Sequence, residues 1–222
     1  MSKKLMLLAV SAVAALAFAA LPALAAAVPI TDTSTGKTVN YTGTSGTTVL
    51  RSSFGNVHCT DDTNQGTFQN GSSSGTVEIT FTGCTGPFGE ECENQGVGTG
   101  KITTGTSPTD LVYIKGFVKT VGVLVTPPSG GVYATFTCHS FIPLTVKVEG
   151  NGIIGHMSSP KCGETKGTFT ISFTASGTTQ TYREIEGSST VYSLTSNGNP
   201  ASEEGTESGT ISGGSTSTLT CL

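Results

Sequence analysis

The sequence predicts an all-β fold: an antiparallel meander that forms a sandwich or a barrel, stabilised by disulfides, with helix only in an N-terminal leader. Three observations predict it. Apolar and polar residues alternate in short segments, as in residues 75–84, where Val77, Ile79 and Phe81 share one face. Glycine accounts for 30 of 222 residues and separates these segments with turns. Six cysteines lie outside the leader, which favours a disulfide framework.

The first 25 residues have the pattern of a bacterial signal peptide. Lys3 and Lys4 precede an uncharged apolar run over residues 5–21, and residues 23–25 are small enough for cleavage after Ala25. A transmembrane anchor is the alternative, but it needs about 20 apolar residues, and Pro22 ends this run. We therefore expect a secreted, extracellular protein with no membrane attachment after cleavage.

The charge of the exported part excludes some partners. Removing Lys3 and Lys4 from the 11 basic residues leaves 9 against 15 acidic ones, a net charge of −6. A mildly acidic protein is a poor ligand for nucleic acid or for an anionic membrane surface. We expect no nucleic-acid partner.

The mature chain is expected to hold a flexible N-terminal arm at 26–36 and one all-β domain at 37–222. Alternating segments predict its strands in chain order: 37–42, 47–53, 57–59, 75–84, 101–104, 111–114, 119–126, 132–138, 144–148, 153–157, 167–174, 182–194 and 207–222. The sequence of residues 167–174 is similar to that of residues 75–82. Two similar halves of the domain, meeting near 127–131, would explain this similarity. The alternative is that threonine-rich strands look alike, which the unequal spacing of the echoes favours.

Two polar segments resemble functional motifs. Residues 61–66 place Asp62, Asn64 and Gly66 at partly suitable calcium-loop spacing, but the remaining ligand positions are missing. We interpret them as a polar turn. Residues 71–75 match the G-x-S-x-G pattern of a nucleophile elbow, but that motif needs a strand before it and a helix after it. Here it precedes a strand, so we interpret it as a serine-rich turn.

The cysteines are expected to form three disulfides. Cys84 and Cys92 flank a Gly-Pro turn and are the favoured pair, with Cys59–Cys138 and Cys162–Cys221 as the remaining two, among the 15 pairings that six cysteines allow. A zinc site is the alternative, but no C-x2-C pair supports it. We expect neither a metal nor a cofactor.

The loop between Cys84 and Cys92 is the candidate binding site, with Phe88, Glu90 and Glu91 at its tip. Exposed aromatic residues on constrained loops often contact partners. The alternative is that Phe88 folds back onto the core, in line with the general burial preference of phenylalanine, and we favour it.

No catalytic residues are predicted. The three histidines, His58, His139 and His156, lack the partners that acid–base or nucleophilic catalysis needs, so we interpret them as structural or surface residues. Glu184 and Glu186 share one face of an expected strand, where they are interpreted as solubilising charges.

Several segments together suggest a family. They are residues 46–53, 57–59, 75–84, 92, 100–102, 123–125, 136–138 and 146–150. From Thr44 to about Thr174 the chain thereby resembles a family of uncharacterised secreted, cysteine-containing all-β proteins of high-GC actinobacteria. The resemblance implies an all-β fold and carries over no catalytic residue or ligand site. Cys162 and Cys221 lie outside the shared pattern.

These observations favour a non-enzymatic extracellular structural or interaction module, whose partners would be the cell envelope or another copy of the chain through sheet edges. A small-ligand-binding barrel is the alternative; it requires an internal pocket above about 300 Å³, which we expect to be lined by Phe81, Phe136, Phe169 and Phe173. An extracellular hydrolase is the second alternative.

Overall fold

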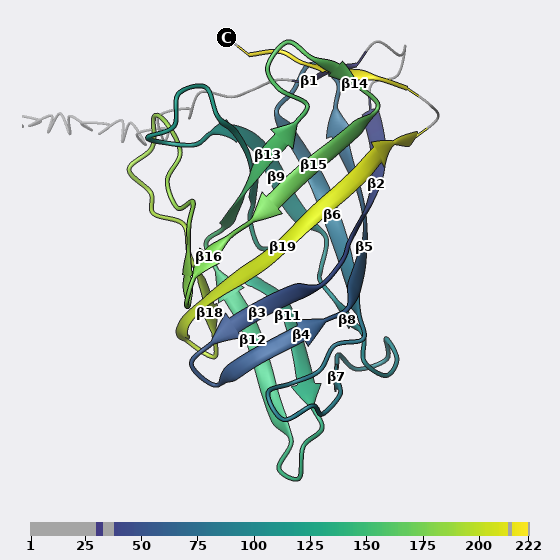
Figure 1. Ribbon diagram of the computed structural model, residues 1–222, viewed down its shortest axis with the longest axis vertical. Helices are drawn as coiled ribbons and strands as arrows, with labels where there is room; N and C mark the ends of the chain where they lie inside the picture. Colours follow the sequence, from purple (N-terminus) through teal and green to yellow (C-terminus); the bar gives the residue numbers. More distant parts are fainter. Residues whose placement is uncertain (1–29, 33–37, 213–214, 222) are drawn as a thin grey trace, which may run out of the picture.

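The computed structural model describes residues 30–32, 38–212 and 215–221 (Figure 1). Eight antiparallel strands form a closed barrel in which neighbouring strands follow one another in chain order, and the pairing of the last strand with the first and the seventh closes it. The strands are β2 (Thr38–Ser45), β5 (Asp61–Gln69), β6 (Ser74–Thr82), β9 (Ser107–Tyr113), β10 (Val121–Val125), β13 (Ile153–Ser159), β15 (Thr168–Phe173) and β19 (Asn199–Ile211). The predicted all-β class is confirmed, and of the two predicted architectures, sandwich and barrel, the structure has the barrel. The signal-peptide prediction lies outside the described residues.

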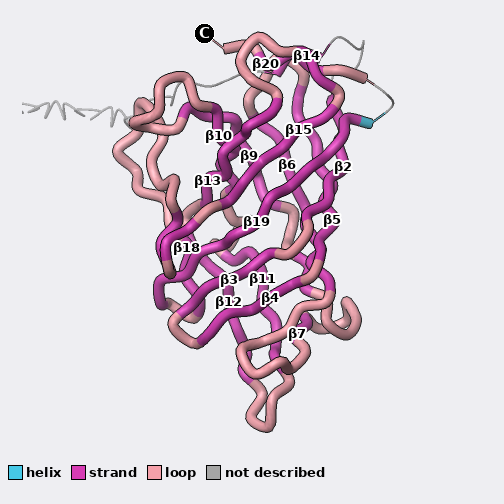
Figure 2. The backbone as a smooth tube through the Cα atoms, viewed as in Figure 1, coloured by secondary structure: helices cyan, strands magenta, loops and turns pink. Residues whose placement is uncertain are grey.

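A second sheet extends one end of the barrel. Its order is β4-β3-β19-β18-β12-β11-β7, so β19 belongs to both sheets and crosses the front of the molecule in Figure 1. The connections between barrel strands supply its other members: β3 (Thr48–Ser52), β4 (Gly55–Cys59), β7 (Cys92–Glu93), β11 (Val132–Cys138), β12 (Leu144–Gly150) and β18 (Leu194–Ser196). The short β8 (Ile102–Thr103) pairs with β6. Figure 2 shows the loops gathered mainly at the two ends of this structure.

Short strands complete the opposite end and one side. β1 (Ile30–Asp32), β20 (Ser217–Leu219) and β14 (Thr165–Lys166) form a three-stranded sheet, and β16 (Ala175–Ser176) pairs with β17 (Thr179–Gln180). The expected flexible arm at 26–36 therefore contains a paired strand, because β20 offers it backbone partners.

The expected strand at 182–194 is wrong for most of its length. Residues 181–193 are irregular apart from one bridge at Ile185, and β18 begins at Leu194.

Alternation of side chains builds the barrel wall. In β2, Val39 and Tyr41 face the interior while Thr42 and Thr44 face solvent, and the same period of two continues in the neighbouring strands. The interior is filled by fully buried aliphatic residues such as Leu111, and each such side chain contributes about 1.5–3 kcal/mol.

Two glycines make room for the aromatic residues that fill one part of the barrel. A Cβ at Gly66 would lie 2.3 Å from the Tyr41 hydroxyl, and one at Gly209 would lie 2.1 Å from the Phe169 ring. Tyr41 stacks on Phe68 with ring centroids 5.4 Å apart and meets the edge of Phe169 at 5.3 Å. A larger residue at either glycine would displace this cluster.

The echoing segments occupy equivalent places in the ring of strands. Residues 75–82 lie in β6 and residues 167–174 include β15, and these strands are four positions apart around the eight-stranded ring. Two halves of four strands in chain order would meet in the loop between β9 and β10, at residues 114–120, rather than near 127–131.

The disulfides join Cys59 to Cys84, Cys92 to Cys138 and Cys162 to Cys221. The third pair is as expected, whereas the predicted Cys84–Cys92 and Cys59–Cys138 pairs are wrong. Cys92 and Cys138 are register partners on adjacent strands β7 and β11, so their side chains meet across the sheet. Closeness in sequence around the Gly-Pro turn misled the prediction, because strand pairing decides which thiols face each other.

Replacing Cys92 and Cys138 together by serine is expected to lower the free energy of unfolding by about 2–4 kcal/mol. The crosslink spans a sequence separation of 46, and without it the unfolded chain gains entropy. Urea unfolding of the variant and the wild type measures the difference. Non-reducing peptide mapping of the wild type provides the control, and a peptide joining Cys84 to Cys92 would contradict the structure.

Candidate functional site

Three carboxyl groups from two strands meet inside the molecule. Period-two alternation along β19 turns Glu203 and Glu207 inward, and β5 presents Asp62 to the same interior. The register aligns Glu207 with Ser45 and Ser45 with Asp62, so these residues form one row across β19, β2 and β5. Asp62 is only 1% exposed.

The predicted polar turn at 61–66 is therefore wrong, since these residues belong to the continuous strand β5. Asp62, Asn64 and Gly66 have turn propensity, but β5 as a whole makes eight register pairs with β2 and eight with β6, which hold these residues extended. Pairing on both sides outweighs local preference. One feature of the sequence indicated that Asp62 and Asn64 share a face: they are two positions apart, and such residues lie on the same side of a strand.

Asp62 and Glu207 form a hydrogen-bonded carboxyl pair. The Ser45 hydroxyl donates to Asp62 Oδ2, and the Asn64 amide donates to Glu207 Oε2. Asp62 Oδ1 receives no hydrogen bond from the amide or hydroxyl donors of the described residues. The Asp62 and Glu207 carboxyl groups lie within hydrogen-bonding range of each other, so a proton held by Glu207 can be donated to Asp62.

Burial controls the protonation of this pair. Burial first, and then the nearby charge of Asp62, raise the pKa of Glu207 to about 9, against the opposing hydrogen bond from Asn64. Burial also raises the pKa of Asp62, while the hydrogen bond from Ser45 opposes the increase. At neutral pH the pair therefore keeps at least one proton.

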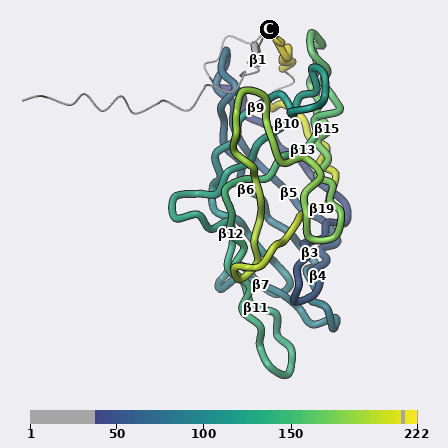
Figure 3. Tube along the Cα trace, turned by 90° about the vertical axis from the view of Figure 1, so that its left-hand side faces the viewer, coloured from purple at the N-terminus to yellow at the C-terminus, as the bar shows by residue number. Residues whose placement is uncertain are grey.

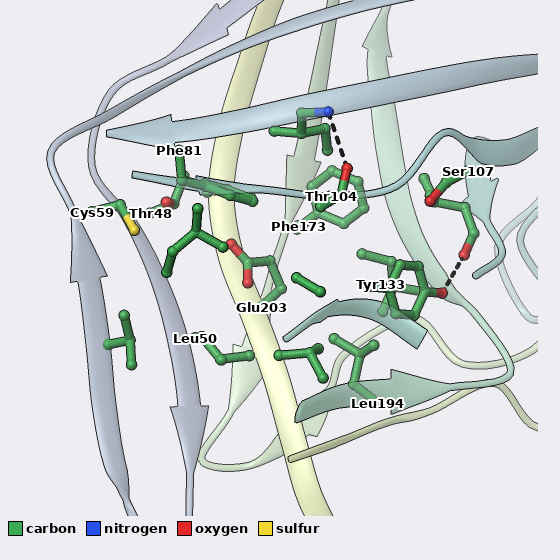
Figure 4. Close-up of a pocket in the computed structure, with 18 of the residues that line it drawn as sticks. Thr48, Leu50, Cys59, Phe81, Thr104, Ser107, Tyr133, Phe173, Leu194 and Glu203 are labelled. Carbon is green, nitrogen blue, oxygen red and sulfur yellow. Dashed lines mark hydrogen bonds between the residues drawn. The ribbon is translucent and has the colours of Figure 1, made fainter. Parts of the chain in front are cut away.

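Glu203 has a different environment, because its carboxyl group faces an internal cavity (Figure 4). Its pKa is raised to about 8, mainly by burial and to a smaller extent by the negative charges of Asp62 and Glu204. Its backbone is held by Gln180, whose side-chain amide donates to Glu203 O and accepts from Glu203 N, both at 2.9 Å. The carboxyl group itself has no hydrogen-bond partner among the described residues.

The cavity has a volume of about 90 Å³ and mostly apolar walls from both the barrel and the second sheet. Phe81, Phe136 and Phe173 line it as expected, whereas Phe169 packs against Tyr41 elsewhere in the barrel. This volume is well below the roughly 300 Å³ that a pocket for a drug-sized ligand requires. A few non-hydrogen atoms fill such a space.

The neighbouring Glu204 points away from this interior. Arg51 Nε and Nη2 both donate to Glu204 Oε2, at 2.9 and 2.6 Å. Two adjacent glutamates on one strand therefore have different environments: Glu204 pairs with Arg51 on the outer face, and Glu203 faces the cavity without a partner.

The predicted binding loop is exposed. Phe88 is 86% exposed, so the favoured expectation that it folds back onto the core is wrong. The Glu90 carboxylate accepts a hydrogen bond from the Phe88 backbone N–H at 2.8 Å, which turns the loop tip outward, and Glu91 is also exposed.

A second exposed loop lies beside it, at residues 139–143 between β11 and β12. Phe141 is fully exposed and Ile142 is 76% exposed. The two loops are joined by a hydrogen bond from His139 N to Glu91 O at 2.9 Å. We call these two loops, residues 85–91 and 139–143, the apolar loop end; Figure 3 shows the hairpin between β11 and β12 extending beyond the rest of the molecule.

The other sequence candidates do not converge. His139 Nε2 lies 3.4 Å from Glu93 Oε1, and the His156 ring contacts that of Tyr182. Glu184 pairs with Lys115 on the surface, and residues 71–75 lead directly from β5 into β6 rather than into a helix. In the described ranges no three His, Cys, Asp or Glu side chains are arranged to hold a metal ion.

A polar depression of about 690 Å³ lies on the outer wall of β2, β5, β6, β15 and β19. Its lining consists mainly of outward threonine and serine hydroxyls, with Glu78 as its single charged residue. Hydroxyl groups at this spacing are the ordinary solvated face of threonine-rich strands.

The described chain is thus an eight-stranded antiparallel barrel with a second sheet, an interior acid cluster and an apolar loop end. No helix within the described residues has the length and apolar character needed to cross a membrane. Comparison with known proteins finds no matching family model, no similar curated protein and no similar solved structure. The resemblance to secreted actinobacterial proteins therefore stays a prediction.

The free energy of unfolding is expected to fall as pH rises from about 5 to about 9. The raised pKa values mean that Glu203 and Glu207 hold protons in the folded state that the unfolded chain, with carboxyl pKa values near 4.5, has already lost. This stabilisation is complete below pH 4.5 and is lost as pH passes through about 8 to 9. Each carboxyl contributes up to about 1.4 kcal/mol per pH unit.

Glu203→Gln is expected to flatten this dependence and to stabilise the protein at pH 9 by more than about 1 kcal/mol. The matched control is Glu204→Gln, which breaks the ion pair with Arg51 on the other face and should keep most of the slope. Urea unfolding at several pH values measures both. Equal slopes in wild type and Glu203→Gln would show that Glu203 titrates normally.

Proposed function

We propose that this protein is a secreted, non-enzymatic interaction module that binds a partner protein through the apolar loop end. The observation that carries the proposal is the exposure of Phe88, Phe141 and Ile142 on two adjacent loops. Large apolar side chains that leave the core and gather on neighbouring loops are typical of contact surfaces.

The loops are held in place, which favours binding. Cys84 and Cys92 at the ends of the first loop are each disulfide-bonded to another strand, and Cys138 at the base of the second loop is bonded to Cys92. The first loop is further closed by hydrogen bonds from Gly86 N to Glu90 O at 2.7 Å and from Gly89 N to Gly86 O at 3.0 Å. A preorganised loop loses little conformational entropy when it binds.

The charge around these side chains indicates the chemistry of the partner. Glu90, Glu91 and Glu93 belong to or follow the first loop, and His139 in the second loop already lies against Glu93. An apolar pocket with a basic rim is the complementary surface, and acidic residues would be repelled by an anionic lipid surface. We therefore favour a protein partner over a membrane.

Other contact modes have less support. Barrel closure removes the edges of its eight strands, and the outer edge of β4 is bridged by Thr85 through hydrogen bonds with His58 of 2.9 and 2.7 Å. Self-association through sheet edges is therefore the weaker proposal. A barrel carrying a drug-sized ligand is weakened by the small cavity.

The absence of enzymatic activity is part of the proposal. Its support is that the three interior carboxyl groups lie apart from all three histidines: His139 lies against Glu93, His156 against Tyr182, and the backbone of His58 bonds to Thr85. Stable labelling of the folded protein by a serine-reactive fluorophosphonate would overturn this part.

Secretion is supported by the three disulfides, which persist in an oxidising compartment.

A triple variant, Phe88→Ser with Phe141→Ser and Ile142→Ser, is expected to reduce binding to the outer surface of the producing cells by at least about tenfold, because it removes the central apolar contacts. Fluorescently labelled protein and flow cytometry measure the binding. The midpoint of thermal unfolding should change little, since all three side chains are exposed.

Val118→Ser is the matched control. Val118 is 93% exposed in the loop between β9 and β10, away from the apolar loop end, and its replacement should leave cell binding unchanged. Equal binding by the triple variant and the wild type would exclude the apolar loop end as the contact surface. Failure of the wild type to bind protease-sensitive surface sites would exclude a protein partner.

A further inference from the structure

We propose that the interior cavity is a binding site for a small organic ammonium ion, with the Glu203 carboxylate as counter-ion and the apolar walls around its alkyl group. This inference goes beyond the interaction function proposed above and does not rest on it. It uses the barrel interior, whereas partner binding uses the external loops.

The first step is that Glu203 alone among the three interior carboxyl groups lacks a hydrogen-bond partner. Asp62 is bonded to Ser45, and Glu207 to Asn64 and Asp62. Glu203 projects from β19 toward the cavity between Phe173 and Leu50 (Figure 4). A carboxyl group that faces an apolar cavity without a partner is costly, so a hydrogen-bond donor placed in the cavity would satisfy it.

The second step is the sign of the charge. The cavity lining contains two carboxyl groups, Glu203 and Glu207, and no Lys or Arg side chain among the described residues. Arg51 on the neighbouring strand β3 is already bonded to Glu204 on the outer face. The complementary ligand is therefore a cation, and its ammonium group provides three donors.

The third step is the character and size of the walls. Phe81, Phe136, Phe173 and Leu194 surround the cavity, and the Tyr133 hydroxyl is turned away to donate to Val125 O at 2.9 Å. An apolar wall favours an alkyl group over a hydrated metal ion. The volume of about 90 Å³ suits an alkyl chain of about three to five carbons.

Binding has a defined proton balance. Burial and the neighbouring charges raise the pKa of Glu203 to about 8, so the carboxyl group is mainly protonated at pH 7. An incoming ammonium ion takes the place of that proton, which leaves to solvent while the ammonium keeps its own. The groups that influence this exchange are Asp62, Glu207 and Glu204, together with the cavity-lining Tyr133. No bond to carbon forms or breaks.

The experiment uses a series of n-alkylammonium chlorides from methyl to hexyl, with the corresponding alcohols as neutral controls. Thermal unfolding of the disulfide-intact protein at pH 7 is measured at constant ionic strength, because a ligand that binds the folded state raises the unfolding midpoint. The expected result is a saturable increase that is largest at about three to five carbons. Isothermal calorimetry in buffers of different ionisation enthalpy should show release of about one proton per ligand.

Two variants and one control test the assigned roles. Glu203→Gln should weaken binding of n-butylammonium by at least about tenfold and leave n-butanol within about twofold. Ala134→Val adds volume to the cavity wall, so it narrows the cavity and should weaken binding of both n-butylammonium and n-butanol. Glu204→Gln lies on the opposite face of the strand and should weaken binding of neither ligand. Because Ala134→Val keeps Glu203, it tests the cavity even where Glu203→Gln does not fold.

Three results would overturn the proposal. An unfolding midpoint that did not respond to any alkylammonium ion would exclude the site. Equal responses to ammonium ions and alcohols would show an apolar cavity without a counter-ion. Equal affinity of Glu203→Gln and Glu204→Gln for n-butylammonium would assign the cation to another part of the surface. None of these results bears on the apolar loop end.

Discussion

The antiparallel pairing of β19 is the constraint on which the rest of the structure depends. This strand pairs with β2 and β15 along one half and with β3 and β18 along the other, so it closes the barrel and joins it to the second sheet. Without it, β2 and β15 would be open sheet edges, which promote aggregation. The closing strand is nevertheless rich in Glu and Gly, residues of low strand propensity.

The placement of acids on β19 follows from this constraint. Because the strand forms part of a closed wall, alternate residues must face the interior, and Glu203 and Glu207 do so. Burying them is unfavourable, and the structure reduces the cost by the hydrogen bond from Asn64 to Glu207 and by protons retained on both glutamates. Carboxyl groups with raised pKa values in an apolar interior are often found at functional sites, and this supports the proposed ammonium site.

The outer loops follow a separate principle. At the apolar loop end, disulfides and backbone hydrogen bonds fix loops whose side chains contribute little to the core. Their exposed aromatic residues have no role in folding that the structure shows. The proposed partner surface and the proposed ammonium site therefore use independent parts of the molecule: one is built on the connections between strands, the other on the closing strand itself.

Much of the fold could be predicted from the sequence. Period-two patterns around Val77 or Val146 depend only on neighbouring residues, so they identified strands and the all-β class. The Phe88 loop could be recognised as a candidate site, but whether its side chain was covered depended on packing by distant segments. The sequence showed that six cysteines were available, and it could not show which of them would face each other.

Tertiary structure alone decided the barrel closure, the disulfide pairs and the interior acid cluster. Asp62 and Glu207 are 145 positions apart, and they meet only because β2 lies between β5 and β19. Read locally, the Asp-rich segment at 61–66 predicts a turn. The sequence by itself determined most of the strands and their alternation, because those depend on local periodicity. The direction of each face was decided by long-range pairing, which turned Glu203 inward and Glu204 outward.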